Sequence, residues 1–134
     1  MKINLEKLIR KKQHKVFEGK LMFGLQKNDI QLFIDVGANF GQSALGIIEW
    51  GYVNEIISIE PVKECHDYLM KNSIKYNNWK ILERMAVGDK DGETEINVSK
   101  ATDLSSILKP TELLKNSFDT VERNFIEKIP IRRL

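Results

Sequence analysis

FIDVGANFGQ, residues 33–42, is the stretch that decides the fold of this chain. The apolar residues 31–36 predict a short strand with an acid, Asp35, near its end. A turn that contains Gly37 and Gly41 follows, and a helical pattern starts directly after it. Strand, turn and helix in this order open the ligand site of many α/β proteins, in which ligands bind beyond the carboxyl ends of the strands. The stretch therefore predicts an α/β fold with a site at this turn.

Helices and strands continue to alternate after this stretch. Residues 42–50 predict a helix that ends at Gly51, and residues 55–60 predict a strand rich in β-branched side chains. Pro61 suits the first turn of the next helix, which extends to about residue 72. Such alternation predicts a parallel sheet with right-handed crossovers.

The second part of the chain predicts further strands. Residues 79–87 and 93–99 have strand patterns, and the turn composition of residues 88–92 between them predicts a hairpin. Residues 110–125 have apolar side chains at helical spacing, and residues 129–134 predict the start of another strand. The expected fold class is α/β with a mostly parallel sheet.

The N-terminal residues precede this pattern. Residues 3–18 predict an amphipathic helix, which Gly19 and Gly24 are expected to break. We therefore divide the chain into an N-terminal helical segment, residues 1–28, and an α/β domain, residues 29–134.

Composition excludes several classes of function. The 134 residues are 42% hydrophobic and 30% charged, which is ordinary for one globular domain. A net charge of +2 is too small to predict binding to nucleic acid or to a membrane surface. No segment approaches the ~20 apolar residues of a membrane span, and Cys65 is the only cysteine, so we expect a cytoplasmic chain without disulfides. Cys65 and His66 are adjacent, which is not metal-ligand spacing, so no metal site is expected.

The sequence of the turn after the first strand distinguishes between two classes of ligand, phosphate-containing nucleotides and S-adenosylmethionine (SAM). A dinucleotide site needs a G-x-G-x-x-G sequence, but counting from Gly37 the second and third glycine positions hold Asn39 and Gln42. A P-loop is excluded because no Gly-Lys-Ser/Thr follows. SAM has no phosphate and carries an ammonium and a sulfonium, which suit the carboxylate of Asp35. Gly37 leaves room for a ligand, Gly41 allows close helix packing, and free N–H groups at the helix start suit the ligand's carboxylate.

Glu60 is a second acid at a strand end, 25 residues after Asp35. An acid about 20 residues beyond a glycine-bearing turn can accept hydrogen bonds from the ribose hydroxyls of a nucleoside. SAM and NAD both contain such a ribose, so Glu60 predicts a nucleoside ligand without choosing between them. The alternative is that both acids only cap helices and that the glycines only make turns.

Several segments together resemble the FkbM family of SAM-dependent methyltransferases. They are FIDVGANFGQ (33–42), ISIEP (57–61) and AVGD (86–89), and Asn72, Asn77 and Ser105-Ser106-Ile107 look similar too. The resemblance implies a Rossmann-like class I methyltransferase fold with SAM as cofactor. It also implies O-methylation of a small-molecule or glycan acceptor, such as a sugar or natural-product hydroxyl.

The resemblance implies roles for individual residues. The residues that would hold the methionine part of SAM are Asp35, Gly37, Ala38, Asn39 and Gly41. Glu60 would hold the ribose, Ala86 would lie near the adenine, and Ser105 and Ser106 would lie on the acceptor side. The catalytic residues stay unknown: no general base is assigned among His14, His66, Asp89, Asp91 and Glu93.

FkbM-family proteins continue beyond the position of Leu134 with further strands and helices, so the resemblance covers only the N-terminal part of the domain. A sheet cut after its first half would have an open edge, which favours self-association. Two other functions therefore remain as alternatives to a methyltransferase. One is a catalytically inactive, truncated remnant that acts as a binding or interaction module. The other is a dinucleotide oxidoreductase, which Asn39 and Gln42 disfavour.

Overall fold

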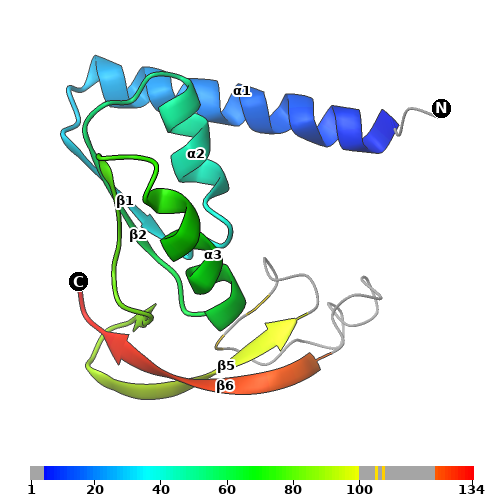
Figure 1. The fold of residues 1–134 in the computed structure, drawn as a ribbon, viewed down its shortest axis with the longest axis vertical. Coiled ribbons are helices and arrows are strands. Elements are labelled where there is room, and N and C mark those ends of the chain that lie inside the picture. The colour runs from blue at the N-terminus through cyan, green and yellow to red at the C-terminus, as the bar shows by residue number, and fades with distance from the viewer. Residues whose placement is uncertain (1–4, 100–104, 106, 108–122) are drawn as a thin grey trace.

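The computed structural model describes residues 5–99, 105, 107 and 123–134, which form an α/β protein. The elements, in chain order, are α1 (Leu5–Lys27), β1 (Leu32–Val36), α2 (Gln42–Glu49), β2 (Glu55–Ile59), α3 (Lys63–Ser73), β3 (Trp79–Ile81), β4 (Ala86–Val87), β5 (Gly92–Ser99) and β6 (Arg123–Arg132). Figure 1 shows α1 across the top of the molecule and the curved ribbon of β5 and β6 at the opposite end.

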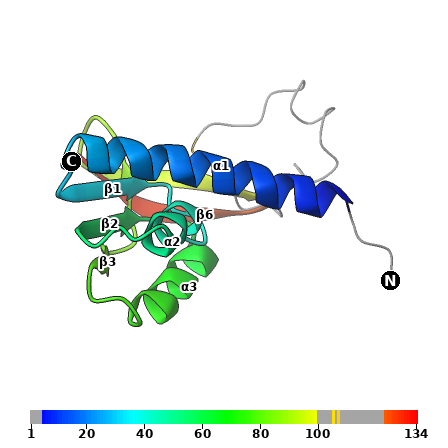
Figure 2. The ribbon, with the colours of Figure 1, turned by 90° about the horizontal axis from the view of Figure 1, so that it is seen from above.

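A parallel sheet in the order β1-β2-β3 forms the first layer. Asp35 pairs with Ser58 and Val36 with Ile59, so β1 and β2 end at the same level. Figure 2 shows α2 and α3 next to each other beside this sheet. Because the strands are parallel, the turn after β1 and the residues after β2 meet at one edge.

The main core lies between this sheet and the helices. Ile47 of α2, Ile56 of β2 and Leu69 of α3 are each 0% exposed. Met22 and Leu25 of α1 pack in the same cluster. The helix at the N-terminus therefore shares a core with the sheet that carries the predicted site.

A second sheet has the strand order β4-β6-β5. β6 pairs with β5 in antiparallel orientation and with β4 in parallel orientation. The predicted hairpin between residues 79–87 and 93–99 is wrong, because β6 lies between β4 and β5. Long-range contacts explain the difference: the Ile131 side chain occupies the space beside Gly88, and Gly88 N donates to Arg132 O at 2.9 Å.

Residues 79–87 do not form one strand. β3 ends at Ile81, and β4 begins at Ala86 in the other sheet. Between them, Arg84 contacts Glu127 and the carbonyl oxygen of Pro61. The chain therefore leaves the first sheet where Arg84 turns toward β6.

α1 is one continuous helix from Leu5 to Lys27, so the predicted breaks at Gly19 and Gly24 are wrong. Glycine weakens a helix by only about 1 kcal/mol relative to alanine, which packing can offset. Gly19 lies against Trp50 at the end of α2, where a Cβ would be 3.2 Å from the indole ring. Glycine at this position lets α1 approach α2 closely.

α2 ends at Glu49 and is capped by Gly51, the glycine that the sequence predicts to terminate it. Gly51 has a φ of +93°, and its amide donates to Ile48 O at 2.9 Å. The amide of Tyr52 donates to Ile47 O, also at 2.9 Å. These two bonds form a Schellman cap, which satisfies carbonyl groups at the end of the helix.

Other predictions concern the last third of the chain. The strand expected at residues 129–134 is confirmed, although β6 begins earlier, at Arg123. Residues 108–122, most of the predicted helix 110–125, lie outside the described residues, as does Ser106. Phe125 belongs to β6, so the predicted end of that helix is wrong.

The proposed boundary between residues 1–28 and 29–134 stays a prediction. Over the parts of the chain that the structure describes, no helix has both the length and the hydropathy needed to cross a bilayer.

Candidate functional site

The turn after β1 is held against the end of β2 by backbone hydrogen bonds. The amides of Gly37 and Ala38 both donate to Ile59 O, at 2.9 and 3.1 Å. Gly37 and Asn39 have φ values of +73° and +49°, which glycine and asparagine adopt more readily than other residues. These residue types therefore stand where the chain bends sharply.

Gly41 closes this turn directly before α2. Its φ is +79°, and a Cβ here would lie 2.7 Å from the Trp79 side chain and 2.9 Å from that of Leu69. Glycine satisfies both the backbone conformation and the limited space. As a result, β3 and α3 pack directly against the turn.

Glu60, at the end of β2, links the turn after β1 to the start of α3. Its side chain is buried: Oε2 accepts a hydrogen bond from Asn39 N and Oε1 accepts one from Val62 N, both at 2.7 Å. Burial raises the pKa of Glu60, and the two N–H donors oppose the increase. Carboxylate oxygens can each accept two hydrogen bonds, so Glu60 can hold the turn and also accept a ligand hydroxyl.

Asp35 is the second carboxyl group of the site. Burial, and then the charge of Glu60, raise the pKa of Asp35 from 3.8 to about 6. Asp35 Oδ2 is buried and accepts no hydrogen bond from the described residues. A cationic group of a ligand next to Asp35 would stabilise the ionised form.

A cavity of about 390 Å³ lies beside the ends of these strands. Ligand pockets commonly enclose about 300–1,000 Å³. The lining residues are Val36, Gly37, Ile59, Pro61, Met85, Ala86, Val87, Ile96, Ser105 and Ile107. Apart from the Ser105 hydroxyl, the side chains are apolar, and a Cβ on Gly37 would meet no atom within 4 Å. An apolar, flat group such as a nucleobase fits such a lining.

The structure brings the predicted cofactor-binding residues to one region, but not all to the cavity wall. Gly37 and Ala86 line the cavity. The others lie next to it, in the turn after β1 and at the end of β2: Asp35, Ala38, Asn39, Gly41 and Glu60. The amides of residues 37–39 all donate within the protein, so the N–H groups that suit a ligand carboxylate would come from Phe40 and from the start of α2.

Sequence reasoning did not connect Cys65, Arg84 or Glu127 with the site. The buried Cys65 Sγ of α3 donates to Asn39 Oδ1 at 3.1 Å and so supports the turn. Arg84 and Glu127 form an ion pair next to Pro61. The position of Cys65 one helical turn after Pro61 could have indicated its role, whereas nothing in the sequence relates residue 84 to residue 127.

The described site has groups suited to contact a ligand but no group placed as a general base. The described cavity lining contains no histidine and no carboxyl side chain. His66 Nε2 lies 2.8 Å from Leu82 O, so the imidazole contacts the chain after β3. Among the residues with described positions, no three His, Cys, Asp or Glu side chains gather as metal ligands would.

Comparisons of the chain with protein-family models, with curated proteins and with solved structures find no match. A functional proposal therefore depends on the residues and contacts of the site. Asp35 and Glu60, next to an apolar cavity, are the features with the most specific chemistry.

Proposed function

We propose that this chain binds SAM at the carboxyl ends of β1 and β2, as part of a SAM-dependent methyltransferase of the FkbM type. One observation carries the proposal: the buried Glu60 and the half-buried Asp35 are chain neighbours of residues that line an apolar cavity, and the Asn39 amide holds Glu60. A cation, a ribose and an apolar base would each find a suitable group there. SAM contains all three.

Each residue would have a defined task in binding. Asp35 would hold the positive charge of the amino-acid part, and its buried Oδ2 has no donor among the described residues. Glu60 would accept hydrogen bonds from the ribose hydroxyls. Gly37 leaves open space next to the backbone, and Ala86 belongs to the apolar wall that would contact the adenine.

SAM supplies an electrophilic methyl group for in-line transfer to a hydroxyl oxygen, for which we propose a sugar or a natural product as the acceptor. The residues of this chain bind the cofactor and fix its orientation. Orientation is a large part of the enzymatic contribution to such a transfer. No residue of the described site is assigned as the general base.

Calorimetric titration of the chain with SAM and with S-adenosylhomocysteine tests the proposal. We expect saturable binding of both compounds and weaker binding of NAD. Asp35→Asn and Glu60→Gln should each weaken SAM binding at least about tenfold, because a hydrogen bond to a charged group contributes about 1.5–3 kcal/mol.

Asp29→Asn and Glu49→Gln are the matched controls. Both carboxyl groups are exposed, Asp29 before β1 and Glu49 at the end of α2, away from the cavity lining. We expect wild-type affinity for SAM in both variants. The proposal is wrong if SAM does not bind saturably, or if NAD binds more tightly than SAM.

The open edge of β1 favours a second candidate function, an interaction module that pairs with a second copy of the chain. β1 pairs only with β2 among the described strands. On the outer face of β1, Leu32, Ile34 and Val36 are 42%, 43% and 51% exposed. β1 has no lysine, no proline and no bulge, which are three of the features that normally prevent edge pairing, and Asp35 is its one charged residue.

The register of β1 favours a symmetric antiparallel pair. Gln31 O accepts from Glu55 N, and Gly37 N donates to Ile59 O, so the odd-numbered residues direct their peptide groups toward β2. The peptide groups of the even-numbered residues therefore point outward. With Ile34 on the two-fold axis, Leu32 would face Val36 of the second copy and Asp35 would face Phe33. No like charges would then be opposite each other.

Light scattering after size-exclusion chromatography tests this second candidate. We expect a concentration-dependent dimer, and we expect Ile34→Lys to abolish it, because a charge on the exposed face opposes edge pairing. Val53→Lys is the control, since Val53 is 79% exposed and lies outside β1. A monomer at every concentration of the wild-type chain would exclude the interaction module.

A further inference from the structure

We propose that Arg84 and Glu127 are a positioning pair for recognition of the ribose by Glu60. The inference rests on the proposed nucleoside site and adds to it a pair of residues that fixes the position of Glu60. Neither residue lines the cavity, and Glu127 comes from β6 of the second sheet. The two residues would act on the ligand through the segment that follows Glu60.

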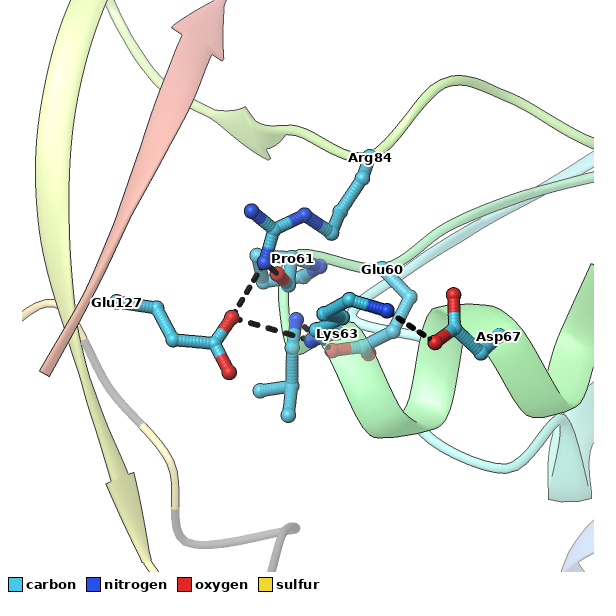
Figure 3. Close-up of polar contacts among 7 residues, drawn as sticks. Glu60, Pro61, Lys63, Asp67, Arg84 and Glu127 are labelled. Carbon is cyan, nitrogen blue, oxygen red and sulfur yellow. Dashed lines mark hydrogen bonds and ion pairs between the residues drawn. The ribbon is translucent and has the colours of Figure 1, made fainter. Parts of the chain in front are cut away.

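Arg84 and Glu127 hold both ends of this segment, Pro61 to Lys63. Figure 3 shows the guanidinium of Arg84 between the Pro61 carbonyl and the carboxylate of Glu127. Arg84 Nη1 donates to Pro61 O at 3.4 Å and also to Glu127 Oε2. The same Oε2 accepts from Lys63 N at 3.2 Å. One carboxylate oxygen thus joins the guanidinium to the first turn of α3.

The segment between these contacts holds Glu60 in place. Val62 lies between Pro61 and Lys63, and its amide donates to Glu60 Oε1 at 2.7 Å. The other oxygen, Oε2, is held by Asn39 N in the turn after β1. A shift of Pro61 or Lys63 would therefore move one of the two donors that fix the carboxylate. Small displacements of a binding group lower affinity because the ligand bonds depend on geometry.

The surroundings make the pair more than a surface ion pair. The side chains of Arg84 and Glu127 are 29% and 14% exposed, in contrast to 65% and 42% for Lys80 and Glu55. Exposed pairs contribute little to stability or position, whereas a largely buried carboxylate depends on its donors. The pair also joins the two sheets at the site. Docking of β6 would in this way complete the ribose-binding group.

A comparison of adenosine with 2′,3′-dideoxyadenosine measures ribose recognition directly. Binding of both nucleosides to the full chain can be followed by ligand-observed NMR. We expect the wild-type chain to prefer adenosine at least about tenfold, because two hydroxyl groups can donate to Glu60. Glu127→Ala should lower this preference toward one and leave the affinity for dideoxyadenosine nearly unchanged.

Conservative variants separate positioning from general structural damage. Glu127→Gln keeps an acceptor for Lys63 N, and Arg84→Lys keeps a cation next to Glu127. Both should recover most of the preference for adenosine that Glu127→Ala and Arg84→Met lose. Glu55→Ala, which breaks the exposed pair with Lys80, is the matched control and should keep the wild-type preference.

The outcomes distinguish this inference from the proposed function. If the wild-type chain binds the two nucleosides equally, ribose recognition and the proposed function both fail. If the preference depends on Glu60, as shown by Glu60→Gln, but survives in folded Glu127→Ala and Arg84→Met, only the positioning role is refuted. Equal loss of affinity for both nucleosides in these variants would also refute it, since that result indicates a structural effect.

Discussion

The environment of Asp35 makes the ionised form of its carboxyl group costly for the stability of the fold. Its pKa is raised from 3.8 to about 6 in the folded chain, first by burial and then by Glu60. Ionisation therefore destabilises the fold: the effect is absent below about pH 3.8, increases as the pH rises, and is complete above about pH 6. A difference of about 2 pKa units corresponds to at most roughly 3 kcal/mol.

Asp35→Asn should become more stable relative to the wild-type chain as the pH rises from 4 to 8. We expect the difference in free energy of unfolding between variant and wild type to increase by up to roughly 3 kcal/mol over this interval. Urea unfolding of both proteins at pH 4 and at pH 8 measures this difference. Any effect of the amide on stability that does not depend on pH cancels when the two pH values are compared. Asp29→Asn serves as the control, and an Asp35→Asn difference that does not change with pH would contradict the prediction.

Gly37 and Gly41 allow a test of backbone strain against crowding. Both have φ above +70°, but only at Gly41 would an added Cβ lie within 3 Å of other side chains, those of Trp79 and Leu69. Replacement by alanine should cost about 1 kcal/mol at Gly37, and about 1–3 kcal/mol more at Gly41 because of overpacking. Urea unfolding of the two variants measures the difference. An equal loss of stability in the two variants would show that β3 and α3 move easily to make room for the added methyl group at residue 41.

Residues with a short-range signal could be identified from the sequence. Asp35 and Glu60 stand out because each ends an apolar strand pattern, and Gly41 because it precedes a helix. The partners of these residues could not be identified in the same way. Cys65 contacts Asn39 through the fold, and Glu127 reaches the site only because β6 docks beside α3.

At the scale of the helix, α1 shows why glycine is a weak signal for a helix end. A Cβ added at Gly24 would meet no atom within 4 Å, whereas one added at Gly19 would lie 3.2 Å from Trp50. Gly24→Ala should therefore stabilise the chain by about 0.5–1 kcal/mol, because alanine loses less backbone entropy. Gly19→Ala should gain less, since the contact with Trp50 opposes the same benefit. Thermal unfolding of both variants tests this order, and an equal or larger gain at Gly19 would contradict it.

The predicted elements were most accurate where one segment determines its own structure. β1, α2, β2 and α3 each have a clear periodicity and a local end signal, such as Gly51 after α2. The pairing of β4 and β5 depended on β6, a strand more than 20 residues away from β5 in the chain. A local turn composition at residues 88–92 cannot show that a distant strand will come between its two flanks.

At the scale of the whole molecule, two hydrophobic clusters meet at α3. Leu69 belongs to the cluster between the first sheet and the helices, and Cys65 belongs to the cluster beneath the second sheet. These residues lie one helical turn apart on the same helix. The Arg84–Glu127 pair adds a polar contact between the sheets. We therefore expect the two sheets to unfold together.

Ile47→Ala and Ile129→Ala test this cooperativity with matched side chains. Ile47 is buried in the first cluster and Ile129 in the second, with 0% and 2% exposure. Each substitution should lower the free energy of unfolding by about 2–5 kcal/mol.

The two tryptophans make the test selective. Trp50 follows α2 and Trp79 lies in β3, so tryptophan fluorescence reports the first cluster, whereas far-UV circular dichroism reports both sheets. If α3 couples the clusters, Ile129→Ala must shift the fluorescence transition, although neither tryptophan belongs to the second cluster. Fluorescence and circular dichroism must then also give the same urea midpoint. A fluorescence transition that keeps its wild-type midpoint while circular dichroism shows an earlier step would mean that the second sheet unfolds on its own. The proposed nucleoside site would then be complete only while β6 is docked, because Glu127 of β6 accepts a hydrogen bond from Lys63 N next to it.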